Sequence, residues 1–136
     1  MNLPTIRSYS LNGYLGWTTT LSVLTPNYTI FKKNSELSRM GSAKIFLLLD
    51  VLPENLCLPG FVVNMPGGAD GFYHYPSSLH KRGGVVSFAD GHVEAHRRTD
   101  ARTRPIVPAG GIVAHSNPSA NNADLAWLRE RATIHN

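Results

Sequence analysis

Histidines and carboxylates gather in one short stretch of the chain. His92, Glu94 and His96 alternate along it, and Asp90 comes two residues before the first of them. Alternate residues of a β-strand lie on one face, so these three side chains are expected to share a face. His80 could fold back beside them. Imidazole nitrogens and carboxylate oxygens are ligands of zinc-like metals, and their grouping therefore predicts metal chemistry.

A small metal-dependent hydrolase is one interpretation of this pattern. The expected metal ligands are His80, Asp90, His92 and His96. A metal-bound water would attack an ester, a lactone or an amide, with Glu94 or Asp90 as general base. The candidate catalytic residues are thus His80, Asp90, His92 and Glu94. The plainer interpretation is a solvated sheet face, because the spacing lacks the specificity of a His-Glu-x-x-His motif on a helix.

A β-hairpin has to position these side chains. Asp90-Gly91 is a strong signal for a two-residue turn between two strands, which span residues 85–89 and 92–97. The core face of this hairpin is expected to hold Val86, Phe88, Val93 and Ala95. The opposite face is expected to hold His92, Glu94 and His96, beside Val85 and Ser87.

The other elements predict an α+β fold with a small antiparallel β-sheet, irregular loops and a short C-terminal helix. Residues 44–51 form the clearest buried strand, and residues 61–64 are expected to lie beside it. The helix should begin after Asn121 or Asn122 and end near Ala132. A chain of 136 residues fits one domain, which would span residues 1–136.

The composition favours a loop-rich domain, and its positive net charge makes nucleic acid a partner to consider. Hydrophobic residues make up 42% of the chain and charged residues 16%, with 12 glycines and 9 prolines. The formal net charge is +4. Its basic clusters, at residues 80–82 and 97–104, come without a basic helix or interleaved aromatic residues. A solvated basic face is therefore preferred, and a nucleic-acid binder is the third interpretation.

Three further residues have side chains that can do chemistry but sit in no recognisable motif. Cys57 is the single cysteine and has apolar neighbours, so a buried, inert thiol is expected. His74 lies among aromatic residues, and a buried core or interface histidine is preferred there to a sugar-binding surface. His115 carries no pattern.

The spacing around the turn resembles a known signature. From His80, nine residues intervene before Asp90-Gly91, in the stretch HKRGGVVSFADGHVE. This is similar to the motif of the prepilin-type processing-associated proteins, a family of type II pseudopilin-like proteins. Weaker similarities lie at residues 7–14, 45–50 and 124–128, so the resemblance extends from about residue 7 to residue 133.

The resemblance implies the fold of a pseudopilin head and a structural, secretion-associated role. Such a domain would act through contacts with other proteins or through self-association. Related heads often hold a calcium ion in a C-terminal loop, so calcium is one expected cofactor and a zinc-like transition metal is the alternative. Carboxylates that could supply oxygen ligands for calcium are Asp70, Asp90, Glu94 and Asp100.

The expected location differs between the sequence as written and the family. Family members begin with a prepilin leader and a long apolar helix, and they belong to the cell envelope or are secreted. The sequence as written has no signal peptide and no segment long enough to span a membrane, which predicts a cytoplasmic protein without a membrane span.

Overall fold

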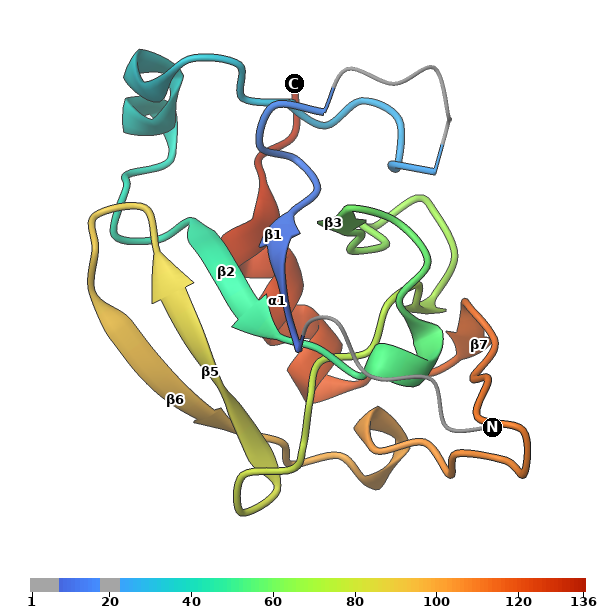
Figure 1. The fold of residues 1–136 in the computed structure, drawn as a ribbon. Helices are drawn as coiled ribbons and strands as arrows, with labels where there is room; N and C mark the ends of the chain where they lie inside the picture. Colours follow the sequence, from blue (N-terminus) through green and yellow to red (C-terminus); the bar gives the residue numbers. More distant parts are fainter. Residues whose placement is uncertain (1–7, 18–22) are drawn as a thin grey trace.

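The computed structural model describes residues 8–17 and 23–136, and its central element is a five-stranded sheet. The strands are β1 (Tyr9–Asn12), β2 (Phe46–Asp50), β3 (Gly60–Phe61), β5 (Gly83–Phe88) and β6 (Val93–Arg97). Their order is β3-β1-β2-β5-β6, and all neighbours are antiparallel except β1 and β3 (Figure 1). Residues 61–64 were predicted beside β2, but the short β3 pairs with β1 instead.

Short elements and loops complete the fold. A second sheet pairs β4 (Gly71–Phe72) with β7 (Asn117–Pro118). Among the described residues, the helices are α1 (Ala123–Ala132) and three 3₁₀ helices, at Asn34–Arg39, Pro53–Asn55 and Ala101–Thr103. A small sheet, irregular loops and one short C-terminal helix confirm the predicted α+β class.

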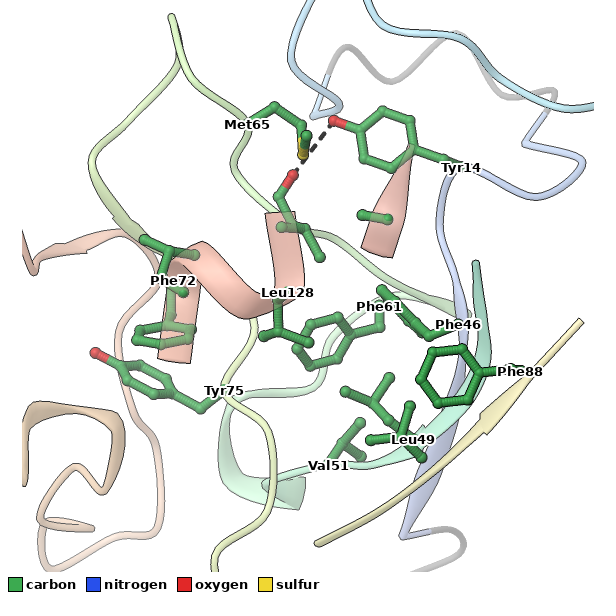
Figure 2. Packing of buried hydrophobic residues seen from close by; sticks show 14 of the residues in the cluster. Tyr14, Phe46, Leu49, Val51, Phe61, Met65, Phe72, Tyr75, Phe88 and Leu128 are labelled. Atoms are coloured by element: carbon green, nitrogen blue, oxygen red, sulfur yellow. Dashed lines mark hydrogen bonds between the residues drawn. The ribbon is translucent and has the colours of Figure 1, made fainter. Parts of the chain in front are cut away.

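The helix α1 lies behind the sheet in Figure 1 and begins where the sequence predicts. The side chain of Asn122 accepts hydrogen bonds from the backbone N–H groups of Asp124 and Leu125, which would otherwise lack partners in the first turn. Leu125 and Leu128 are buried. Figure 2 shows Leu128 facing Phe61, so the helix closes the core over the sheet.

Residues of β2 and β5 build the core side of the sheet. Val86 and Phe88 alternate on β5. An irregularity between Phe46 and Leu48 of β2 lets both Phe46 and Leu49 be buried. Phe46 and Leu49 of β2 and Val86 and Phe88 of β5 are each at most 1% exposed. Figure 2 shows Phe46, Leu49 and Phe88 around Phe61, and burying side chains of this size contributes about 2 kcal/mol each. The clearest predicted strand is therefore confirmed as the centre of the fold.

The β5–β6 hairpin has a register one residue away from the prediction. Ser87 pairs with Val93, so the loop between the facing residues Phe88 and His92 has three residues, 89–91, instead of two. Phe88 donates its N–H to the carbonyl of His92, and Gly91 takes a positive φ of 95°. The Asp90 carboxylate accepts the N–H of His92 at 3.1 Å, and this bond stabilises the longer loop.

A shift of one residue moves every side chain of the strand to the other face. Val93, predicted in the core, is 61% exposed, and Ala95 is exposed as well. Both share the outer face with Val85, whereas His92 stacks on Phe88 and His96 stacks on Trp127 of α1. The predicted core positions on β6 are therefore wrong, and the histidines lie on the helix side of the hairpin.

The outer face of the sheet also carries exposed apolar side chains. Tyr9 and Leu11 of β1 are 57% and 38% exposed, and Val85 of β5 is 44% exposed. A face of this kind is compatible with the predicted role in protein contacts, which stays a prediction. None of the helices among the described residues has the length and apolar character needed to cross a membrane.

Candidate functional site

The predicted catalytic residues at the hairpin loop come together only in part. His92 lies between two carboxylates, with Nδ1 2.5 Å from Asp90 Oδ1 and Nε2 3.3 Å from Glu94 Oε1. The hydrogen bond to Asp90 raises the pKa of His92. Hydrogen bonds from the N–H and the ring of His92 lower the pKa of Asp90. All three groups are solvated, so this is a surface ion cluster.

The other two predicted ligands have different partners. His96 stacks on Trp127 with ring centres 3.9 Å apart, and its Nε2 lies 3.6 Å from Asp124. Burial, followed by the nearby charge of Arg98, lowers the pKa of His96. His80 is exposed in the turn before β5. Across residues 8–17 and 23–136 these side chains do not form a group that could hold a metal, so their metal and hydrolase roles stay predictions.

A different group does bring metal-ligating side chains together, namely Cys57, His74 and His115. They come from three segments far apart in the sequence. His74 follows β4 and His115 precedes β7, so the pairing of these two short strands places the histidines side by side. The N–H of Val113 donates to the carbonyl of Glu54 at 3.0 Å. This bond attaches the segment that carries His115 to the 3₁₀ helix that precedes Cys57.

The donor atoms of this group lie within 4.8 Å of one another. Cys57 Sγ is 3.2 Å from Nε2 of His115 and 3.7 Å from Nε2 of His74. His74 is 1% exposed, His115 is half-buried and Cys57 is exposed. The sulfur is therefore open to solvent on one side and faces two imidazoles on the other.

The partners of each ring fix which nitrogen carries the proton. Val62 donates its N–H to Nδ1 of His74 at 2.9 Å, so the neutral ring carries its proton on Nε2, toward the sulfur. Nδ1 of His115 lies 2.7 Å from the carbonyl oxygen of Tyr73, which can only accept. This ring carries its proton on Nδ1, and its Nε2 is free to accept a proton from Cys57.

A buried asparagine holds this arrangement in place. Asn55 is 4% exposed, and its Oδ1 accepts the N–H of Tyr75 at 2.7 Å. Its Nδ2 donates to the carbonyl of Tyr73 at 2.9 Å, the same oxygen that orients His115. The ring of Tyr73 stacks on that of His115 with centres 4.4 Å apart. These contacts hold the ring of His115 in position. Nδ2 of Asn55 also lies 3.2 Å from Nδ1 of His115, but the shorter contact of 2.7 Å to the carbonyl of Tyr73, which can only accept, assigns the proton to Nδ1.

The tautomers of the two rings determine which atom donates and which accepts in each hydrogen bond at Cys57 Sγ. Nε2–H of His74 donates to Sγ, and the thiol of Cys57 donates to Nε2 of His115. Burial raises the pKa of Tyr73, and its electrostatic and hydrogen-bonding interactions with Cys57 raise it further. The arrangement contains a nucleophile, a base and a group that orients the base, which is the pattern of an activated nucleophile.

The same three side chains could hold a transition metal ion. A tetrahedral zinc ion bound by sulfur and nitrogen separates these atoms by about 3.5 Å, and the two observed distances lie on either side of that value. His115 is ready to bind through Nε2, with Nδ1–H held by a carbonyl as is usual for ligating histidines. His74 would first have to move its proton to Nδ1 and lose its bond to Val62.

No local pattern in the sequence predicts this site, and the prediction of a buried thiol at Cys57 is wrong. Apolar neighbours favoured burial, but the loop after the 3₁₀ helix turns the sulfur outward. His74 is buried as predicted. Cys57 is 17 residues from His74 and 58 from His115, which matches no ligand spacing. The only local sign was the combination of one cysteine with histidines that no motif explained.

Comparison with known proteins returned no matching family model, no matching curated protein and no matching solved structure. The resemblance to pseudopilin-like proteins therefore stays a prediction from the spacing between His80 and Gly91, and the geometry around Cys57 is the basis on which a function can be proposed.

Proposed function

We propose that this protein uses Cys57 as a nucleophilic thiol that His115 activates. The observation that carries the proposal is the 3.2 Å contact from Sγ to an imidazole nitrogen that is free to accept a proton. The thiolate is the nucleophilic form of cysteine, and an adjacent histidine promotes its formation. The exposure of Cys57 gives an electrophile access to the sulfur.

Transfer of the proton produces a thiolate beside an imidazolium. The thiolate then accepts hydrogen bonds from two Nε2–H groups, those of His74 and His115. Hydrogen bonds to a charged group are stronger than those between neutral groups, so this pair stabilises the charge on sulfur. The carbonyl of Tyr73 keeps its bond to Nδ1–H throughout, and the ring does not have to rotate.

Alkylation of Cys57 by iodoacetamide tests this proposal. We expect His115→Gln to lower the second-order rate constant about 10-fold at pH 7 in the presence of a chelator, because glutamine cannot take the thiol proton. The rate is measured by intact-mass spectrometry, and thermal unfolding verifies that the variant is folded. His135→Gln, which removes an exposed histidine next to the last residue of the chain, is the matched control. Equal rates for His115→Gln and the unmodified protein would refute the assignment of the base.

Binding of a transition metal ion is the second candidate function, and the grouping of three donor atoms within 4.8 Å favours it. Sulfur and imidazole nitrogen suit zinc, copper or nickel and do not suit calcium, which takes oxygen ligands. The calcium prediction therefore draws no support from this group. With three protein ligands, a tetrahedral ion would keep one position open for water or substrate.

Zinc titration measures this second function. We expect one zinc ion per chain, Cys57→Ser to abolish binding, and His115→Gln to weaken it about 100-fold. Binding should release the thiol proton, which calorimetry in two buffers of different ionisation enthalpy detects. A zinc affinity that Cys57→Ser leaves unchanged would place the metal elsewhere, and the hairpin cluster around His92 would be the next site to test.

A further inference from the structure

We infer that Cys57 exchanges with the disulfides of low-molecular-weight thiols, which makes it a site of reversible S-thiolation. The inference rests on the proposed nucleophilic thiol and adds the substrate class of that same site. Two features support it. The hydrogen-bond donors around Cys57 point at its sulfur, and the proton on His115 can pass to a leaving thiolate.

The donors around Cys57 converge on the sulfur itself. Nε2–H of His74 lies 3.7 Å from Sγ, and Nε2 of His115, which carries the proton after the transfer, lies 3.2 Å from it. A site accelerates the reaction whose transition state carries charge where its donors point. In disulfide exchange the negative charge stays on sulfur atoms throughout, whereas in acyl transfer it moves to an oxygen. The cluster therefore fits a sulfur-centred reaction.

The proton balance also suits this substrate. The thiolate of Cys57 attacks one sulfur of the disulfide, a new S–S bond forms, and the electrons of the broken S–S bond leave with the other sulfur. That leaving thiolate takes the proton from Nε2 of His115, which had received it from Cys57. The products are a mixed disulfide at Cys57 and one free thiol, with no net oxidation. Exchange is faster when the leaving sulfur is a weaker base, so a proton donor helps most for strongly basic alkyl thiolates.

The product has no resolving partner within these 136 residues. Cys57 is the single cysteine, so a mixed disulfide formed there persists until a thiol from another molecule attacks it. The exposed sulfur remains accessible to that second thiol. The modification also occupies the sulfur, so S-thiolation and zinc binding at Cys57 exclude each other.

Two disulfides with different leaving groups test the inference on the chelator-treated protein. Bis(hydroxyethyl) disulfide releases a basic alkyl thiolate, and dithiodipyridine releases a weakly basic aromatic one. We expect His115→Gln to slow exchange about 100-fold with the alkyl disulfide but only about 10-fold with the aromatic one, because the alkyl thiolate needs the proton from His115. Intact-mass spectrometry identifies the adduct at Cys57, and Cys57→Ser should show none.

The outcomes separate this inference from the proposed function. Equal losses with both disulfides, together with His115-dependent alkylation, would overturn disulfide exchange and leave the nucleophilic thiol standing. Alkylation that does not depend on His115 would overturn both. A covalent dimer through Cys57 without a small-thiol adduct would also overturn the inference. Should His115→Gln fail to fold, the wild-type chain in denaturant gives the same comparison, since unfolding should slow the alkyl disulfide more than the aromatic one.

Discussion

Val86→Asp is expected to unfold the protein, whereas Val85→Asp is expected to leave it folded. The two residues are neighbours on β5, but Val86 is fully buried and Val85 is 44% exposed. Burying an unpaired carboxylate costs about 5 kcal/mol or more, which is comparable with the whole stability of a small domain. Circular dichroism and urea unfolding measure the difference.

Val93→Asp extends this test to the register of the hairpin. Val93 is 61% exposed, so its replacement should change the free energy of unfolding by about 0.5 kcal/mol. A two-residue turn would instead place Val93 opposite Phe88 in the core, and the same substitution would then unfold the protein. Loss of the fold in Val93→Asp would therefore contradict the three-residue loop.

The hairpin illustrates how far the sequence predicts this fold. The strands, the turn and the N-cap of α1 follow from local signals that act over a few residues, and all were predicted. The observed register includes a bond between the Asp90 carboxylate and the N–H of His92, but Asp-Gly is compatible with both loop lengths. The error on β6 followed because one residue of slip reverses every side chain.

The candidate site could not be predicted because nothing local specifies it. Cys57, His74 and His115 meet through the pairing of β4 with β7, two strands of two residues each. Strands so short carry no alternating pattern from which their pairing could be recognised. By contrast, His92 and Asp90 are only two residues apart in sequence, and a local argument was enough to bring them together.

Asp124 is the other position where one substitution should have a large effect. Its carboxylate is 1% exposed and accepts the N–H groups of Thr99 and Asp100 and the hydroxyl of Thr103. These bonds attach the chain after β6 to the first turn of α1. Burial alone would raise the pKa of Asp124, but the bonds from Thr103, Asp100 and Thr99 outweigh burial and lower it.

Asp124→Asn should therefore lower the free energy of unfolding by about 3 kcal/mol at pH 7, because several donors lose a charged acceptor. Asp70→Asn is the matched control. Its carboxylate is solvated, lies 3.4 Å from Arg129, and should contribute less than about 1 kcal/mol. Urea unfolding of the three proteins measures both effects. A loss for Asp124→Asn no larger than that of the control would show that the buried carboxylate does not hold the two segments together.

The effect should also depend on pH, with a sign that the pKa shifts determine. The pKa of Asp124 is lower in the folded protein than its ordinary value of 3.8, so its contribution is complete above that value and is lost as the pH falls further. The pKa of His96, which faces Asp124 and Arg98, is likewise lower than its ordinary 6.5. Its protonation therefore destabilises the fold as the pH falls below that value.

Two substitutions separate these contributions. Asp124→Asn removes the titration of the carboxylate, and His96→Gln removes the titration of the imidazole. Because His96 and Asp124 interact, the Asp124 comparison is made in the His96→Gln background. There the difference in stability that Asp124→Asn causes should be constant near neutral pH and shrink below about pH 3.8. The decline of wild-type stability just below pH 6.5 should be weaker in His96→Gln. The raised pKa of His92 acts in the opposite direction, but both comparisons cancel it because His92 is present in every protein. A difference for Asp124→Asn that grows toward acid would mean that the folded protein raises the pKa of this carboxylate, and the hydrogen bonds would then not outweigh burial.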